Sequence, residues 1–431
     1  MRPSSILIRT SGVLLLVLGC LLRDPYLLPV RSWALPTILT AGAMVTLWLL
    51  AKDKADLPTL VVWAAVLIVP AGFEVHFTLR KCHLLAQGEP AKTLGGHFMV
   101  GYARIEDVEP LAEKGLIGGI YVGRQNIASL QRDIARLQAL RRANGLPPLI
   151  VATDQEGGLV SRLSPLLTRL PPLSTLAELP ANQRADVARA YGYFQGSEMA
   201  AVGITVDFSP VVDLKGAAVR WDRNSFIARR AISGDPTIVG DVAEAYARGL
   251  RGAGILPTLK HFPGLGRVQG DTHHVRVRLS ASTSDLEAAD WIPFRRLLAD
   301  GPALLMVGHV ILDSVDPLQP ASRSRAVIDG LIRQQWGFQG GIITDDLTMP
   351  SVFHHDFCQA VTGALDAGAD LLLLSYDGDQ YYRALDCALE SLRQGRLPHF
   401  RPVASPPQAL KNAAPTAKST ETSARYYVAE L

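Results

Sequence analysis

The stretch Ile255-Leu256-Pro257-Thr258-Leu259-Lys260-His261-Phe262-Pro263-Gly264 joins a short apolar run to polar and turn residues. Its first half has the length and composition of a buried strand, and a lysine and a histidine stand where that strand ends. The same order returns at Leu149-Ile150-Val151-Ala152, which leads into Thr153-Asp154. Longer amphipathic stretches lie between such runs. This alternation predicts an α/β fold with parallel strands.

Eight strand-like runs follow one another along the chain. They are residues 98–100, 118–122, 149–152, 204–208, 255–259, 303–307, 341–344 and 370–374. Helical periodicity fits the intervening segments, for example 127–142 and 182–201. Eight strands that alternate with helices over roughly 300 residues predict a (β/α)8 barrel of the TIM type. A doubly wound open sheet is the competing architecture, but no Gly-rich dinucleotide fingerprint follows a strand.

The apolar excess of the chain lies in front of this pattern. Of the 431 residues, 48% are hydrophobic and 19% are charged, whereas about 25% are charged in an average soluble protein. Residues 32–51 carry no charge, residues 57–73 form a second long apolar run, and residues 10–22 form a shorter one. Buried core helices are an alternative interpretation, and the first run alone resembles the core of a signal peptide. We expect two to three transmembrane helices.

These patterns predict a membrane segment over residues 1–82, a (β/α)8 barrel over 83–398 and a disordered tail over 399–431 that is rich in Pro, Ala, Lys, Thr and Ser. The expected location is the inner or plasma membrane, with several spans in the lipid bilayer. The Lys and Arg residues near the runs divide evenly between the two sides, so they do not set the orientation. Three spans with the N-terminus inside would place the barrel on the non-cytoplasmic side.

Charge and cysteine content exclude several other classes. The net charge of +3 is too small to indicate a nucleic-acid partner. Cys20, Cys82, Cys358 and Cys387 form no CxxC pair, which excludes a disulfide scaffold and a cysteine zinc site. The cysteine content does not show whether the protein works in an oxidising or a reducing compartment.

Polar residues gather at four predicted strand ends. The third run is followed by Thr153-Asp154-Gln155-Glu156-Gly157-Gly158. The fifth run leads to Lys260-His261 and then to Asp271-Thr272-His273. The sixth ends at Gly308-His309, and the seventh ends at Asp345-Asp346. Active sites of (β/α)8 barrels lie at the carboxyl ends of the strands, so we expect these loops to form one site.

Two features of these loops suit proton transfer and nucleophilic attack. Asp271 can accept a hydrogen bond from one ring nitrogen of His273, which would orient the ring and raise its basicity. Asp345 is a carboxylate at a strand end that could attack an electrophilic carbon. Other side chains in these loops are suited to holding hydroxyl groups: Asp154, Arg162, Lys260 and His261.

Each feature also has an ordinary structural interpretation. Asp-x-His in a loop is usually a turn with a solvated histidine, and an Asp-Asp pair often caps a helix N-terminus. Histidine and aspartate could also bind a metal, but no HxxxH spacing is present, so no metal ligand is predicted. The catalytic interpretation is favoured because all of these residues fall at strand ends of one predicted barrel.

Three motifs stand out when they are taken together. They are Ala152-Thr153-Asp154-Gln155-Glu156-Gly157-Gly158, Lys260-His261-Phe262-Pro263-Gly264 with Asp271-Thr272-His273, and Thr344-Asp345-Asp346-Leu347-Thr348-Met349. This set resembles bacterial β-N-acetylglucosaminidases of glycoside hydrolase family 3. Phe208-Ser209-Pro210-Val211-Val212-Asp213 and Val307-Gly308-His309-Val310 match the family in the expected order. The resemblance covers about residues 95–394 and leaves the membrane segment and tail unmatched.

The resemblance implies a retaining hydrolase that acts on terminal β-linked N-acetylglucosamine, typically from peptidoglycan fragments. Asp345 would attack the anomeric carbon and form a covalent glycosyl-enzyme, and His273, paired with Asp271, would be the acid/base. By motif position, the residues that would hold the sugar are Asp154, Arg162, Arg230, Lys260 and His261. The resemblance implies no metal and no organic cofactor.

The sequence departs from the family pattern at a few positions. Leu159 stands where the family usually has Arg, Leu265 where it has His, and Ala228 where it has Gly. These changes leave the predicted nucleophile and the His–Asp pair in place. A β-glycosidase or phosphorylase of different sugar specificity is an alternative, as is a non-catalytic membrane glycan sensor. A sensor would have little need for Asp345, Asp271 and His273 together.

Overall fold

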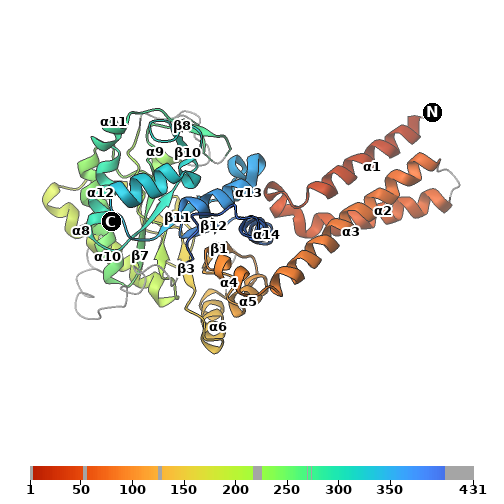
Figure 1. Cartoon of the computed structure of the whole chain (residues 1–431), viewed down its shortest axis with the longest axis horizontal. Helices are drawn as coiled ribbons and strands as arrows, with labels where there is room; N and C mark the ends of the chain where they lie inside the picture. The colour runs from red at the N-terminus through yellow and green to blue at the C-terminus, as the bar shows by residue number, and fades with distance from the viewer. Residues whose placement is uncertain are drawn as a thin grey trace. The chain divides into compact units, whose positions relative to one another are not determined.

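The structure is a computed structural model that describes residues 3–51, 56–124, 129–216, 226–268, 270–272 and 274–402. The chain divides into two units, Met1–Ala86 and Gln87–Leu431 (Figure 1). Most of the predicted tail, from residue 403 onward, lies outside the described residues.

Three helices form the first unit: α1 (Pro3–Leu21), α2 (Leu28–Ala51) and α3 (Leu57–Leu85), with a short 3-10 turn η1 (Pro25–Leu27) before α2. Asp56 caps α3, since its side chain accepts the backbone N–H of Thr59 at 3.1 Å. Two helical segments, Pro25–Ala51 and Leu57–Leu85, are long and apolar enough to cross a membrane, whereas the apolar part of α1, Ile6–Leu21, is shorter.

Helices α1 and α3 pack closely along most of the length of α1. A Cβ atom at Gly19 would lie only 2.5 Å from the ring of Pro70, so glycine is what allows the two backbones to approach. At the end of α1, Nε and Nη2 of Arg23 donate to the two carboxylate oxygens of Glu74 at 3.1 and 2.5 Å. A small core that includes Ile38, Trp63 and Val66 fills the space between the helices.

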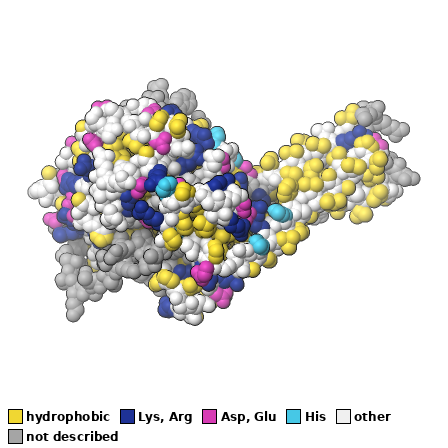
Figure 2. Space-filling view, in the orientation of Figure 1, with side chains coloured by type: hydrophobic (Ala, Val, Ile, Leu, Met, Phe, Trp, Pro, Cys, Tyr) yellow, Lys and Arg dark blue, Asp and Glu magenta, His cyan; other side chains and the backbone are white. Residues whose placement is uncertain are grey.

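The outer surface of this unit is apolar. Most of the exposed large hydrophobic side chains in the described part of the chain lie between Ile6 and Leu79, including Leu14, Leu47 and Ile68. Hydrophobic side chains cover the visible face of α1, α2 and α3 (Figure 2). Exposed apolar surface of this extent is uncommon on a water-soluble unit.

The second unit is a closed barrel of eight parallel strands, in the order β1-β12-β11-β9-β7-β6-β3-β2. The strands are β1 (Phe98–Gly101), β2 (Gly119–Tyr121), β3 (Ile150–Thr153), β6 (Val206–Asp207), β7 (Leu256–Phe262), β9 (Leu304–Val307), β11 (Ile342–Asp346) and β12 (Leu371–Leu374). All eight predicted strand-like runs are strands of this barrel, so the predicted (β/α)8 architecture is confirmed. Strands β7 and β11 continue past their predicted ends into the candidate site residues: β7 includes Lys260 and His261, and β11 includes Asp345.

Helix α4 (Glu89–Gly95) precedes β1, and α14 (Gln380–Arg393) follows β12. The helices between the strands are α5 (Ile105–Glu113), α6 (Leu130–Ala143), α7 (Ser174–Ala177), α8 (Ala181–Ala201), α9 (Ile227–Arg230), α10 (Pro236–Gly252), α11 (Thr283–Glu287), α12 (Trp291–Asp300), η3 (Ala321–Arg323), η4 (Ala326–Gln335) and α13 (Pro350–Ala367). Capping residues mark the ends of some of these helices. Asp235 caps α10 ahead of Pro236, accepting the N–H of Thr237 at 2.7 Å. Gly368 ends α13 in the left-handed conformation, with φ of 98°.

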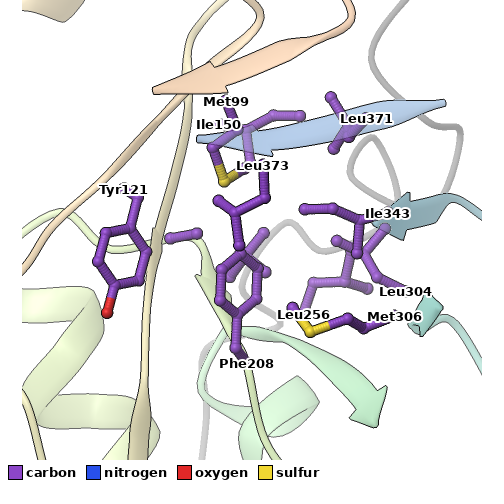
Figure 3. Close-up of a cluster of buried hydrophobic side chains, with 12 residues drawn as sticks. Met99, Tyr121, Ile150, Phe208, Leu256, Leu304, Met306, Ile343, Leu371 and Leu373 are labelled. Carbon is purple, nitrogen blue, oxygen red and sulfur yellow. The ribbon is translucent and has the colours of Figure 1, made fainter. Parts of the chain in front are cut away.

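Two short two-stranded sheets lie outside the barrel sheet. Strands β4 (Gln155–Gly157) and β5 (Val160–Ser161) form a hairpin directly after β3, and β8 (Val277–Leu279) pairs with β10 (Val310–Leu312). Inside the barrel, apolar side chains from the strands meet in one cluster that includes Met99, Phe208, Met306 and Leu373 (Figure 3). The interior of the barrel is therefore a packed apolar core, and a polar site has to lie at an end of the barrel.

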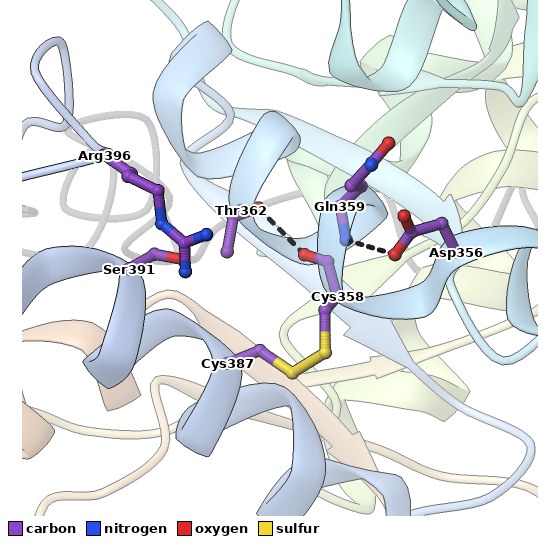
Figure 4. The surroundings of a disulfide bond; sticks show 7 residues. All are labelled: Asp356, Cys358, Gln359, Thr362, Cys387, Ser391 and Arg396. Atoms are coloured by element: carbon purple, nitrogen blue, oxygen red, sulfur yellow. Dashed lines mark hydrogen bonds between the residues drawn. A yellow bond between two sulfur atoms is a disulfide. The ribbon is translucent and has the colours of Figure 1, made fainter. Parts of the chain in front are cut away.

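A disulfide joins the last two helices of the barrel. Cys358 of α13 and Cys387 of α14 are bonded, with their Cα atoms 5.5 Å apart (Figure 4). The spacing of the cysteines along the sequence did not indicate this pair. The other two cysteines, Cys20 and Cys82, are free and exposed.

Candidate active site

Lys260 lies between two carboxylates near the carboxyl end of β7. Its Nζ atom is 2.5 Å from Oδ1 of Asp154 and 2.6 Å from Oε1 of Glu156. Asp154 follows β3 directly, and Glu156 lies in β4. Burial alone would lower the pKa of the Lys260 ammonium group, but the two carboxylates outweigh it and raise that pKa. Lys260 therefore stays charged although only 2% of its side chain is exposed.

A second cation binds the same glutamate. Arg230, at the end of α9, donates from Nε and Nη2 to the two carboxylate oxygens of Glu156 at 2.9 and 2.6 Å. This bidentate pair fixes both side chains. Burial opposes ionisation of Glu156, yet Arg230 and Lys260 lower its pKa to about 2. Glu156 is therefore an anion that joins two cations from distant parts of the sequence.

His261 has a fixed orientation beside these groups. Its Nδ1 atom lies 2.8 Å from Oδ2 of Asp213, which also accepts the backbone N–H of His261 at 3.1 Å. Because a carboxylate only accepts, Nδ1 carries the ring proton, and Nε2 faces Nη2 of Arg230 at 3.5 Å. Asp154, Glu156, Arg230, Lys260 and His261 are called the Lys260 cluster below.

Tyr121 and Arg162 complete the surroundings of Asp154. The hydroxyl of Tyr121, the last residue of β2, donates to Oδ2 of Asp154 at 2.9 Å. The backbone N–H of Arg162 donates to the carbonyl of Asp154 at 3.0 Å. Partial burial would lower the pKa of the Arg162 guanidinium, but Tyr121, Asp154 and Glu156 outweigh it and raise that pKa. Both Asp154 oxygens are thus held in place by neighbouring donors.

The two aspartates at the end of β11 differ in their surroundings. Asp346 is buried, and its oxygens accept from Thr348, from the Ser375 hydroxyl at 2.6 Å and from the Tyr376 N–H at 2.9 Å. Asp345 is partly exposed, and its Oδ1 accepts the N–H of Asp346 at 2.8 Å. Asp346 is therefore a structural group that ties β11 to the loop after β12, and Asp345 is the carboxylate that a bound molecule can reach.

His309 supports the main chain next to Asp345. Its Nε2 atom donates to the carbonyl of Asp346 at 3.1 Å, and its Nδ1 lies 2.7 Å from the Ser322 hydroxyl. Burial lowers the pKa of His309, and the charge of Asp345 only partly offsets this effect. A neutral ring with its proton on Nε2 satisfies both contacts.

The loop of the predicted acid/base is only partly described. Asp271 is buried, with 8% of its surface exposed. The loop is tied to the start of α13, because the Ser351 hydroxyl donates to the carbonyl of Thr272 at 2.5 Å. Since α13 follows β11, the loop is fastened to the segment after Asp345. His273 lies outside the described residues, so its pairing with Asp271 stays a prediction.

The structure brings Asp154, Arg230, Lys260 and His261 into one cluster, through partners that were not predicted as site residues. These partners are Glu156, Asp213 and Tyr121. Glu156 is two residues after Asp154 in the Asp-Gln-Glu-Gly-Gly motif, and Asp213 is the last residue of the Pro-Val-Val-Asp segment. Both residues therefore lie in motifs already identified in the sequence. Within the described ranges, no group of three or more His, Cys, Asp and Glu side chains is placed to hold a metal ion.

The family model for the glycosyl hydrolase family 3 N-terminal domain matches residues 94–401. The chain belongs to glycoside hydrolase family 3. A "Beta-hexosaminidase" of Nitrosomonas eutropha is 34% identical over 296 residues, which are 66% of this chain and 82% of that protein. "Beta-hexosaminidase LpqI" of Mycobacterium tuberculosis is 34% identical over 317 residues, which are 72% of this chain and 79% of that protein.

Solved family 3 structures have the same fold. A family 3 β-N-acetylglucosaminidase from Paenibacillus has a TM-score of 0.68 and 28% identity, over 80% of this chain and 68% of that one. NagZ from Neisseria gonorrhoeae has a TM-score of 0.62 and 29% identity, over 78% of this chain and 97% of that one. This family 3 chain is therefore a glycoside hydrolase, an enzyme that cleaves glycosidic bonds.

Leu159, one of the residues that depart from the family pattern, lines a surface cavity. Several lining residues are sequence neighbours of the Lys260 cluster, such as Arg229 next to Arg230. The cavity has a volume of about 550 Å³ and is lined by Gly158, Leu159, Arg169, Leu170, Pro171, Pro172 and Arg229. Leu159 forms part of its apolar lining, where the family usually has Arg. Arg169 holds the hairpin turn, since its Nε and Nη2 both donate to the carbonyl of Gly158 at 3.2 Å.

Proposed function

We propose that the chain is a membrane-anchored, retaining β-N-acetylglucosaminidase that releases terminal β-linked N-acetylglucosamine from peptidoglycan-type glycans. The observation that carries this proposal is the Lys260 cluster at the barrel end where β11 presents Asp345, in a chain of family 3. Its relatives bear the name β-hexosaminidase. NagZ from Neisseria gonorrhoeae has been crystallised with N-trifluoroacetyl-D-glucosamine.

The first step forms a glycosyl-enzyme. A carboxylate oxygen of Asp345 attacks the anomeric carbon as the bond from that carbon to the leaving oxygen breaks. His273 gives its proton to the leaving oxygen, so the aglycone departs as an alcohol. Asp271 accepts a hydrogen bond from the other ring nitrogen of His273 and stabilises the ring in the required orientation. The partial exposure of Asp345 supports its role as nucleophile, since Asp346 is enclosed by donors.

The second step returns the enzyme to its starting state. A water molecule attacks the same carbon from the face that the aglycone left, and the bond to Asp345 breaks. His273 takes a proton from this water, so the sugar is released with its original anomeric configuration. Overall, water is consumed and no redox change takes place.

Sugar recognition is assigned to Asp154, Lys260, His261 and Arg162, with Arg230 as a further contact. The side chains of Asp154, Lys260, His261 and Arg230 are fixed by one another and by Glu156 and Asp213 before a ligand arrives. Such preorganisation reduces the entropy lost on binding and holds the anomeric carbon in reach of the nucleophile. The buried charges in the Lys260 cluster also act in a medium of low polarity, where hydrogen bonds to hydroxyl groups are strong.

Membrane anchoring is assigned to α1, α2 and α3. The apolar outer surface of these helices supports this assignment, as do the lengths of the two candidate spans. The close packing of α1 on α3 at Gly19, with the Arg23–Glu74 pair at its end, supports a third helix that stays in the mature protein.

The barrel is assigned to the non-cytoplasmic side of an inner or plasma membrane. Three spans with the N-terminus inside give this orientation. The Cys358–Cys387 disulfide supports it independently, because disulfides persist in oxidising compartments and are rare in the cytosol. A reporter that is active only outside the cytoplasm, fused to the C-terminus, tests this orientation.

The test of the activity uses the full chain in detergent. Initial rates are measured on chromogenic β-N-acetylglucosaminide, β-glucoside and β-xyloside, with and without inorganic phosphate. The proposal predicts the highest kcat/KM on the N-acetylglucosaminide and no dependence on phosphate. A higher value on another glycoside would overturn the sugar assignment, and a sugar phosphate as product would indicate a phosphorylase. Glycan binding without turnover would indicate a sensor.

A further inference from the structure

A closed set of hydrogen bonds adjoins the Lys260 cluster. It joins Gln155, the first residue of β4, to Gln195 of α8, Asp207 of β6 and Tyr246 of α10. These four residues, called the Asp207 network, are each exposed by 1% or less. Bulk water therefore does not reach these side chains, and every contact within the network needs one proton between its two atoms.

The side-chain amide of Gln195 has only one consistent orientation. Its Nε2 atom lies 2.5 Å from the backbone carbonyl oxygen of Gln155, and a carbonyl oxygen can only accept. The NH2 group must therefore face Gln155. The amide oxygen of Gln195 is then the atom that lies 2.8 Å from the hydroxyl of Tyr246.

The hydroxyl of Tyr246 has a single proton and faces three side chains: Gln195, Asp207 and the hydroxyl of Ser209, which can itself donate. The amide oxygen of Gln195 can only accept, so the Tyr246 proton is directed to it. The same hydroxyl oxygen lies 3.1 Å from Oδ2 of Asp207. Two acceptors would repel at this distance, so the proton between them has to come from Asp207. The other oxygen of Asp207, Oδ1, accepts the backbone N–H of Gln155 at 2.9 Å.

We propose that Asp207 is a neutral carboxylic acid and a positioning residue, whose network fixes the main chain between Asp154 and Glu156. This proposal rests on the proposed function for its kinetic test but not for its spectroscopic one. Asp207 does not touch the sugar; it acts through Gln155.

The electrostatics around Asp207 agree with the geometry. Burial raises the pKa of this carboxyl well above its ordinary value. Of the charged neighbours, Lys260 acts to lower it and Asp154 acts to raise it. Asp207 also affects two nearby tyrosines, Tyr191 and Tyr246. Burial raises the pKa of both hydroxyls, and the charge of an ionised Asp207 would raise it further.

The network reaches three residues of the site through Gln155. Besides its backbone contacts, the amide oxygen of Gln155 accepts the N–H of Leu163 at 3.0 Å, and its Nε2 donates to the Ser164 hydroxyl at 3.3 Å. Gln155 thereby fixes Asp154 and Glu156 on either side of it and the segment that bears Arg162. Loss of the Asp207 anchor should shift all three.

The kinetic test compares Asp207→Asn with Asp207→Ala in the full chain. Asparagine reproduces the neutral acid, since its NH2 donates to Tyr246 and its oxygen accepts from Gln155. We expect Asp207→Asn to restore kcat/KM on the N-acetylglucosaminide to within about threefold of wild type, and Asp207→Ala to lose at least about tenfold, because small displacements of positioning groups cost up to about 100-fold.

Asp213→Asn is the matched control. The Asp213 oxygens face the backbone N–H groups of His261 and Leu265, and the NH2 group of an asparagine would face one of these donors, so the amide cannot replace the carboxylate. Asp213→Asn should therefore lose activity where Asp207→Asn keeps it. Equal losses in Asp207→Asn and Asp207→Ala, or a folded Asp207→Ala with wild-type kinetics, would overturn the proposal.

Infrared difference spectroscopy tests the proton directly and needs no turnover. The spectrum of wild type minus Asp207→Asn at neutral pH should contain the C=O band of a protonated carboxyl group. Carboxylate bands in its place would overturn the proposal. If Asp207→Ala does not fold, Asp207→Asn and this spectrum decide the question alone. If wild type has no glycosidase activity, the proposed function fails while the spectrum still tests Asp207.

Discussion

The ammonium group of Lys260 lies 2.6 Å from the carboxylate of Glu156, and the two side chains are only 2% and 5% exposed. Arg230 binds the same carboxylate with two hydrogen bonds. Glu156 thus stabilises two buried cations at once, and Asp154 supplies a second negative charge to Lys260. The result is a rigid, charged surface at the end of the barrel that is ready to hold a polar ligand.

Replacing Glu156 by glutamine should damage both activity and stability. The amide leaves Lys260 and Arg230 without their shared anion, and breaking a buried pair costs about 3 to 5 kcal/mol. We expect a loss of that order in the free energy of unfolding, measured by chemical denaturation, and a fall in kcat/KM of at least about tenfold.

The matched control is Glu109→Gln. Glu109 pairs with Arg136 at 2.6 Å, but the arginine side chain is 61% exposed, so the pair is worth at most about 1 kcal/mol. Equal effects of Glu156→Gln and Glu109→Gln would show that the buried pair has no special role.

The sequence was sufficient to predict the barrel because each strand is a short apolar run that is bounded by polar residues. Asp154 and Lys260 could be placed at one end of it, since the carboxyl ends of parallel strands meet there. Their direct contact could not be predicted, because it depends on the depth at which Lys260 enters the barrel. The structure shows that β7 continues through Phe262, so Lys260 lies within the strand.

Residues that hold a site residue in place, without contacting the ligand themselves, were the hardest to predict from the sequence. Glu156 lies in a turn-rich motif, where a glutamate is usually solvated, and only the fold brings Arg230 to it. The Cys358–Cys387 pair depends on the packing of α13 against α14, which no spacing along the chain reveals. Asp207 looked like part of an apolar strand, and its role depends on side chains from two helices.

Removing the disulfide should lower stability and leave the site intact. A cross-link that closes a loop of about 30 residues contributes roughly 3 kcal/mol. Cys358→Ser should therefore unfold at a lower temperature than wild type, and a reducing agent should lower wild type to the same midpoint. Cys82→Ser is the control, since Cys82 is free and exposed. A midpoint of wild type that does not respond to reduction would contradict the bond.

Acid should destabilise the barrel through His97. Burial lowers the pKa of His97 from 6.5 to about 4, so the folded state keeps the ring neutral while the unfolded chain takes up a proton. The stabilising effect is fully present above pH 6.5 and is lost as the pH falls toward about 4, by up to roughly 3 kcal/mol.

His97→Phe should remove this part of the pH dependence. The free energy of unfolding of both proteins is measured at neutral pH and near pH 4. Wild type should lose more stability than the variant across this range. Parallel curves for the two proteins would contradict the assignment to His97.

We propose Asp345 as the nucleophile of a retaining β-N-acetylglucosaminidase. The most direct measurement is release of a chromophore from a β-N-acetylglucosaminide by the full chain in detergent, beside its Asp345→Asn variant. We expect wild type to turn over and the variant to lose more than about 1000-fold in kcat, with an unchanged unfolding midpoint. A folded Asp345→Asn variant whose turnover stays within about tenfold of wild type would contradict it.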